Sequence, residues 1–413
     1  MSAGAKRWPQ YLATFAATMG AFGLGTGIAW ASPALPLLKK SCQSNLQLKN
    51  ESSENCAFTF EDGIDEDQAK WVSSIFNLGA MVAAVMTGIL LGKVGRKWAM
   101  IINCVPMALG YLCLMFPIWV EGTNPSFFFV GRFLTGKQNQ QVWNIFMHFQ
   151  SHFLGVGCGG FALAPPVYVG EVTETSIRGA MGACMQFMLT VGIIFVSAFG
   201  IEHCVKVNVI SGLCLLPPIA CALIMFFMPE SPYYLITKGK ISEAEKALSW
   251  FRGGVDVKDE LAEMQRAYQD QQKIGSVSFV KLVADKVYLQ PFVLMLALMF
   301  FQQFSGINAV NFNLVSIFQD VGSQMDEGLQ GFIINIAQTC ACGLAVVLVD
   351  RLGRKPLLSI SGTLMSISIF GLGAFFYLKE NADPDTPDAL FKMTESEVKD
   401  IAWLPLVRFI GNY

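Results

Sequence analysis

Residues 92–97 read GKVGRK, and residues 350–355 read DRLGRK. Each of these short basic turns follows an apolar run, 71–91 in the first case and 328–349 in the second. Matching turns in two distant parts of one chain are typical of membrane proteins that contain an internal structural repeat. The sequence therefore predicts two related halves, each built from membrane-spanning helices.

The composition also indicates a membrane protein. Of the 413 residues, 53% are hydrophobic and only 15% are charged, whereas soluble domains carry about 25% charged residues. The net charge of −2 and the scattered basic residues argue against a nucleic-acid partner. The sequence contains neither a phosphate-binding glycine loop nor a nucleophile–base set, so we expect neither an enzyme nor a cofactor.

A membrane span needs about 20 apolar residues, and this length identifies nine spans. They cover 11–38, 71–91, 98–118, 127–170, 180–201, 208–228, 290–318, 328–349 and 356–377, and a tenth apolar run begins at Trp403. We predict an all-α membrane protein in three parts. These are an N-terminal transmembrane bundle (1–237), a cytoplasmic helical linker (238–286) and a partial C-terminal transmembrane bundle (287–413).

The loops between the spans predict the orientation of the chain. Lys and Arg are concentrated in the turns at 92–97 and 350–355, while the loop 39–70 is acidic. Because basic loops stay in the cytoplasm, we expect a cytoplasmic N-terminus and an external loop 39–70, in the plasma membrane. In that loop Asn50 begins a glycosylation sequon, and Cys42 and Cys56 either form a disulfide bond or remain free thiols.

The linker is the one long polar segment on the cytoplasmic side. Residues 241–272 are predicted to form a helix, with Ser242 as its N-cap. Ala244, Leu248 and Phe251 recur at helical spacing on one face. The charged residues of the linker are expected to form a solvated face.

Six stretches of the sequence point to a known family. They are GKVGRK at 92–97, VGRFLTG at 130–136, PPVYVGEVTETSIRGAMG at 165–182, PESPYYL at 229–235, QQFSGIN at 302–308 and VDRLGRK at 349–355. In this order they resemble the sugar porters of the major facilitator superfamily, in particular the animal facilitative glucose and trehalose transporters. The resemblance implies the major facilitator fold, with a six-helix N-terminal bundle and a truncated C-terminal bundle, about 9 of 12 spans in all. It also implies uniport of a hexose or trehalose by alternating access.

Amide side chains within the spans are candidates for substrate binding. A neutral sugar needs hydrogen-bond donors and acceptors without net charge, and amides supply both. The resemblance assigns Gln186, Gln302, Gln303 and Asn308 to sugar binding, and Asn313 adds further polarity to the same segment. Amides also join neighbouring membrane helices by hydrogen bonds, so a purely structural role stays open.

A second group of candidate residues lies where the predicted spans leave the membrane. It consists of Arg96, Arg132, Glu171, Arg178, Glu230, Asp350, Arg351 and Arg354. In the family that the chain resembles, such residues form salt bridges that hold the outward-facing state. Ordinary positive-inside topology is the alternative for the arginines. The chain departs from the family pattern at Gly92, where a carboxylate is common.

The first span favours uniport over proton coupling. Its sequence contains no carboxylate, whereas proton-coupled relatives carry one in this helix. The expected partners are therefore a small neutral sugar and the lipid bilayer. A non-transporting truncated isoform and a membrane sugar sensor remain alternatives. His148 and His152 lie four residues apart without an evident third ligand, so no metal site is expected.

The segment 137–155 interrupts the fourth predicted span and makes it too long for one crossing. The codons of Gly136-Lys137 can contain a splice donor, and those of Phe153 to Gly155 can contain an acceptor. We therefore interpret 137–155 as a retained intron. A similar donor can lie at Val407-Arg408, so 408–413 can have the same origin, and about three spans are expected to be missing.

Overall fold

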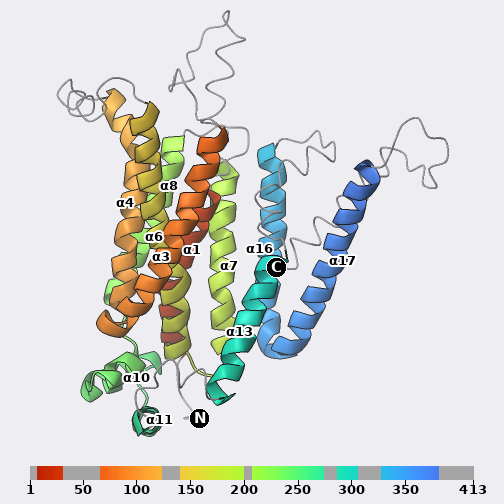
Figure 1. The fold of residues 1–413 in the computed structure, drawn as a ribbon. Coiled ribbons are helices and arrows are strands. Elements are labelled where there is room, and N and C mark those ends of the chain that lie inside the picture. The colour runs from red at the N-terminus through yellow and green to blue at the C-terminus, as the bar shows by residue number, and fades with distance from the viewer. Residues whose placement is uncertain are drawn as a thin grey trace, which may run out of the picture.

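The computed structural model describes residues 7–30, 66–122, 140–199, 207–273, 286–305 and 327–380 (Figure 1). The long helices are α1 (Trp8–Ala29), α3 (Glu66–Val94), α4 (Arg96–Gly122), α6 (Gln140–Val172), α7 (Arg178–Ser197), α8 (Val207–Phe227), α13 (Lys286–Phe304), α16 (Glu327–Leu352) and α17 (Arg354–Glu380). The short helices are α9 (Pro232–Thr237), α10 (Ile241–Phe251) and α11 (Lys258–Lys273). Since these described ranges contain no strand, the predicted all-α class is confirmed for them.

Each of the nine predicted spans corresponds to a described helix. Eight described helices are long and apolar enough to cross a membrane: α1, α3, α6, α7, α8, α13, α16 and α17. The remaining predicted span, 98–118, coincides with α4. The apolar run at Trp403 lies outside the described residues.

Helix α6 shows how the segment 137–155 fits the fold. The helix contains 33 residues, or about 50 Å at 1.5 Å per residue, which exceeds the roughly 30 Å of the hydrocarbon core. Its apolar membrane-spanning part is Phe153–Val172. The backbone from Gln140 to Gly155 continues the same helix. The retained-intron interpretation concerns the transcript and stays a prediction.

Six helices, α1, α3, α4, α6, α7 and α8, pack into one bundle that we call the first half (Figure 1). Helix α1 contacts α6, α7 and α8, while α3 and α4 both pack on α6. The largest fully buried side chains include Tyr111, Phe161 and Tyr168. The Tyr111 hydroxyl lies 2.9 Å from that of Thr26, so this buried polar pair is satisfied within the bundle. The predicted six-helix N-terminal bundle is confirmed.

Glycines bring α1 and α7 into backbone contact. A Cβ atom on Gly25 of α1 would overlap the carbonyl of Leu189 in α7. In the same way, a Cβ atom on Gly192 of α7 would overlap the carbonyl of Phe22 in α1. Because no side chain fits between them, α1 and α7 form one closely packed pair.

Helices α9, α10 and α11 lie together at one end of the first half, which we call the linker end; the opposite end is the far end (Figure 1). The prediction of one helix over 241–272 is wrong, because Gly253 and Gly254 adopt positive φ angles of 75° and 88° and separate α10 from α11. Ser242 is not the N-cap: that position belongs to Lys240, which makes no side-chain capping bond. The apolar face predicted for α10 is buried, as expected.

Helices α13, α16 and α17 form what we call the second half. Helix α16 packs along α7, and this is the main described contact between the two halves. Helix α13 buries none of its side chains against the described residues, and large apolar side chains of α17 such as Phe370 (79% exposed) also point outward. Such surfaces suit contact with lipid.

Candidate functional site

The amides predicted to bind sugar lie on helices of both halves. Gln186 is half-buried in the middle of α7, the first-half helix that packs on α16. Gln302 is half-buried and Gln303 is exposed in the last turn of α13. Asn308 and Asn313 lie outside the described residues. The described amides therefore belong to helices of the two halves, and their role in binding stays a prediction.

Helix α16 adds polar side chains that the sequence analysis did not single out. Gln338 (6% exposed) and Thr339 (9% exposed) are buried, and Asn335 donates a hydrogen bond from Nδ2 to Ser197 Oγ of α7 at 2.8 Å. A buried amide within an apolar helix is costly unless it finds a partner. The sequence did carry a signal for them, because three amides, Gln330, Asn335 and Gln338, lie in the apolar run 328–349.

The first charged network joins α4, α6 and the start of α9 at the linker end. Arg96 Nη2 lies 2.6 Å from Glu171 Oε1, and the two side chains are only 13% and 18% exposed. The second carboxylate oxygen of Glu171 accepts a hydrogen bond from the Ser231 hydroxyl. Glu171 thus binds a charged donor and a neutral donor at once, which makes this contact stronger than a surface ion pair.

Glu230 binds the N-terminus of α4 rather than an arginine side chain. Its Oε1 accepts hydrogen bonds from the backbone N–H groups of Arg96 (2.9 Å), Lys97 (3.1 Å) and Ser231 (2.9 Å). A carboxylate is favourable there because the first N–H groups of a helix have no partner within it. Gly95, at φ 106°, lies directly beside this carboxylate.

Two tyrosines fix the backbone around this network. Tyr168 donates a hydrogen bond to the carbonyl of Pro229 (2.9 Å), and Tyr234 donates one to the carbonyl of Lys93 (2.8 Å). Burial, and then the Glu230 carboxylate, raise the pKa of Tyr234. Its phenol therefore remains protonated at neutral pH and able to donate.

The remaining predicted charged residues have different surroundings. Asp350 of α16 accepts a hydrogen bond at Oδ2 from the backbone N–H of Ala180, in the first turn of α7, at 2.9 Å. Arg178 donates to the carbonyl of Thr173 (3.2 Å). Arg351 and Arg354 are exposed and form no ion pair within the described part of the chain. Arg132, Asn50, Cys42 and Cys56 lie outside the described residues.

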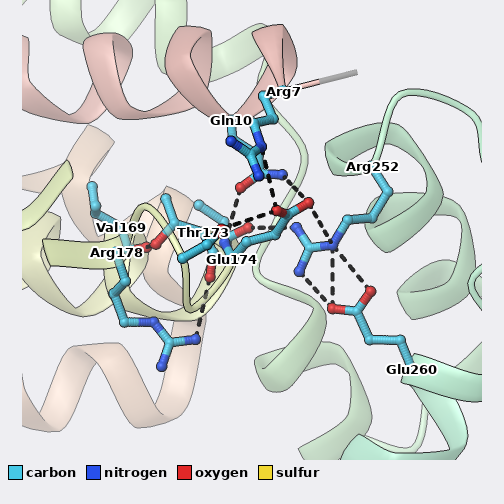
Figure 2. A network of polar contacts seen from close by, with 10 residues as sticks. Arg7, Gln10, Val169, Thr173, Glu174, Arg178, Arg252 and Glu260 are labelled. Carbon is cyan, nitrogen blue, oxygen red and sulfur yellow. Dashed lines mark hydrogen bonds and ion pairs between the residues drawn. The ribbon is translucent and has the colours of Figure 1, made fainter. Parts of the chain in front are cut away.

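A second charged network, not anticipated from the sequence, docks the linker on the first half (Figure 2). The Glu174 carboxylate accepts from Gln10 Nε2 (3.2 Å) and pairs with Arg7 (3.6 Å) and Arg252 (4.0 Å). Arg252 also donates to the carbonyl of Val172 (3.1 Å) and to both carboxylate oxygens of Glu260. With Arg252 only 8% exposed, the prediction of a purely solvated linker surface is wrong at this residue.

The Sugar (and other) transporter family matches residues 12–387. The chain belongs to the sugar transporter family. The family and the relatives below are transporters. A multi-pass membrane sugar transporter, and not an enzyme, is therefore confirmed, and neither a non-transporting truncated isoform nor a sugar sensor is favoured.

Among its relatives, the chain is 32% identical over 403 residues to the facilitated trehalose transporter Tret1 of Apis mellifera ligustica. This match covers 97% of the chain and 69% of the relative. It is also 32% identical over 407 residues to Tret1 of Anopheles gambiae, covering 98% of the chain but 44% of that relative. The chain thus spans between under half and about two thirds of the length of these two relatives.

Solved structures confirm the major facilitator fold. The proton:xylose symporter XylE bound to 6-bromo-6-deoxy-D-glucose is similar with a TM-score of 0.75 at 20% identity, over 98% of this chain and 78% of XylE. For the inward open conformation of XylE from E. coli the TM-score is 0.63 at 19% identity, and the match covers 98% of this chain and 79% of XylE.

Proposed function

We propose that this chain carries a neutral sugar, trehalose or a hexose, down its concentration gradient by alternating access between its two halves. The observation that carries this proposal is the junction of α7 and α16, where helices of the two halves meet and bring polar side chains into the apolar interior. Transporters with duplicated bundles bind substrate near the membrane midplane at such a junction.

In this proposal the substrate is held by amides of both halves. Gln186 contributes from the first half, and Gln302, Gln303, Asn308 and Asn313 contribute from the second. Each amide offers a donor and an acceptor, as sugar hydroxyls require. Substrate binding then draws the halves together without the desolvation of a charge.

The linker end is assigned to the cytoplasm. Lys93, Arg96 and Lys97 lie at this end of the first half, and Arg351, Arg354 and Lys355 at the second basic turn. Concentration of Lys and Arg in short loops marks the cytoplasmic side. The N-terminus then lies in the cytoplasm, Asn50 lies outside, and the plasma membrane is the proposed location.

The charged residues are proposed to stabilise the closed state of the cytoplasmic side. The contact that supports this role most directly is Asp350 with the N-terminus of α7, because it joins the two halves. Arg96, Glu171 and Glu230 contribute to the closed state only indirectly, because they fix the turn between α3 and α4 within the first half. Arg132, Arg178, Arg351 and Arg354 complete the proposed set.

The proposal is tested by uptake of radiolabelled trehalose and glucose into proteoliposomes that contain the purified chain. We expect saturable uptake, and for Gln186→Ala we expect a KM increased roughly tenfold, as for loss of one hydrogen bond to substrate. Gln269→Ala is the matched control, because Gln269 is an exposed amide of α11. Absence of uptake of any hexose or disaccharide by the unaltered chain would contradict the proposal.

A further inference from the structure

Helices α7 and α16 contact each other at both ends. At the linker end, Asp350 accepts from the backbone N–H of Ala180 at 2.9 Å. At the far end, Asn335 donates from Nδ2 to Ser197 Oγ at 2.8 Å. Fifteen residues separate 335 from 350, which is about 22 Å of helix. The two contacts are therefore separated by most of the roughly 30 Å thickness of the hydrocarbon core.

The two helices keep one antiparallel register between these contacts. Phe187 of α7 faces Gly343 of α16, where a Cβ atom would come within 3.4 Å of the ring. Thr190 lies beside Cys342. Residue numbers rise along α7 as they fall along α16, so all the contacts belong to one continuous seam between the halves.

The far-end contact has the geometry of a specific hydrogen bond. Ser197 is buried (8% exposed), and its hydroxyl donates its single proton to the carbonyl of Ile193 at 2.9 Å. The Ser197 oxygen is therefore oriented to accept from Asn335. Each side chain would lose a partner in an apolar setting if the helices separated, and this costs free energy.

Alternating access opens the two ends of this seam in turn. When the site opens to the far side, the ends of α7 and α16 near Ser197 and Asn335 must separate, while Asp350 can keep its contact. When the site opens to the linker side, Asp350 must leave Ala180, while the Asn335 contact can persist. The two contacts thus stabilise opposite states.

We propose that the Asn335–Ser197 hydrogen bond is a gating contact on the external side, which opposes the Asp350 contact on the cytoplasmic side. This inference rests on the proposed transport function and on the assigned orientation. Its loss shifts the population toward the outward-open state, whereas loss of the Asp350 side chain shifts it toward the inward-open state.

Hydrogen–deuterium exchange of the full chain in lipid nanodiscs tests this inference. We expect Asn335→Ala and Ser197→Ala each to accelerate exchange about threefold in the far-end peptides, 190–199 and 327–336, as suits one interhelical bond in a membrane. Asp350→Ala should accelerate exchange in 178–184 and 346–352 instead. The double variant of Asn335 and Ser197 should change no more than either single variant, because both remove one bond.

Ile336→Ala is the matched control, since Ile336 follows Asn335 on the same helix and is 39% exposed. The exchange of α1 peptides reports whether each variant is folded. The inference is overturned if Asn335→Ala and Ile336→Ala give the same far-end exchange, or if both ends of the seam loosen equally in every variant.

Sugar uptake by the same samples separates this inference from the proposed function. If the unaltered chain takes up no sugar while the opposite exchange effects are present, the transport proposal fails and the two opposed contacts stand. If uptake occurs but the exchange effects are absent, the gating inference alone fails.

Discussion

Gly95 and Glu230 occupy adjoining space, so that a Cβ atom on Gly95 would overlap Oε2 of Glu230. The glycine holds a φ of 106°, and the carboxylate beside it caps the first N–H groups of α4. Gly95 thus allows both the sharp break between α3 and α4 and the space for the Glu230 carboxylate, which stabilises the start of α4. Gly353, at φ 83°, makes the corresponding break between α16 and α17.

Gly95→Ala is expected to destabilise the protein by about 2–3 kcal/mol. The substitution forces a side chain into a positive-φ conformation and displaces the Glu230 carboxylate. Thermal unfolding of the purified protein in detergent measures the effect. Gly92→Ala is the control in the same turn, because a Cβ atom there meets nothing within 4 Å. Its stability should be unchanged or slightly increased, and equal losses for the two variants would contradict the assignment.

Glu171→Ala is expected to cost roughly 2 kcal/mol of stability. The change leaves the mostly buried guanidinium of Arg96 without its carboxylate and removes the acceptor of the Ser231 hydroxyl. Unfolding in detergent is again the measurement. Lys240→Ala is the control, since Lys240 and Glu243 form an exposed pair (56% and 55%) that should contribute little. A loss no larger than that of the control would show that the Glu171 network is not stabilising.

Arg252→Ala is expected to release the linker from the first half. Arg252 joins the C-terminal end of α6 (Val172) and the turn after it (Glu174) to Glu260 of α11. Its removal should weaken docking by roughly 1–2 kcal/mol. Limited proteolysis should then cleave within 238–273 several times faster. Arg252→Lys should rescue docking only in part, because an ammonium group cannot reproduce the bidentate contact. Arg266→Ala, at an exposed position of α11, should leave cleavage unchanged.

Uptake is expected to be independent of a proton gradient. Helix α1 contains no Asp or Glu, and its buried residues are small or uncharged. This helix therefore lacks a carboxylate that could bind and release a proton near neutral pH during the cycle. Initial rates in proteoliposomes should be equal with and without an inward proton gradient. A severalfold acceleration by the gradient would contradict uniport.

Much of the fold followed from the sequence because membrane spans are encoded by length and hydrophobicity. The nine predicted spans correspond to described helices, and each basic turn contains the positive-φ glycine, Gly95 or Gly353, at which one helix ends and the next begins. The linker was predicted less well. The apolar positions of α10 kept helical spacing, but the effect of Gly253 and Gly254 on helix continuity was overlooked.

The charged residues were predicted as a group, but their pairing was not. Arg96 and Glu171 do form an ion pair, whereas Glu230 and Asp350 bind backbone N–H groups, which leave no signal in residue type. Arg252 was overlooked because a charged residue in a polar linker is usually solvated, and only the packing of α10 on the first half buries it. The contact of Asn335 with Ser197 depends on the register of two helices far apart in the sequence.

The close approach of α1 and α7 at Gly25 and Gly192 has a consequence for inherited variation. At these two codons every missense change introduces a side chain where two backbones already touch, so we expect such alleles to be eliminated from natural populations. On the outward surface of α17, Phe370 should drift freely among apolar residues. Natural sequence variation in this protein should therefore be lowest at glycines such as Gly25 and Gly192, which have no side chain.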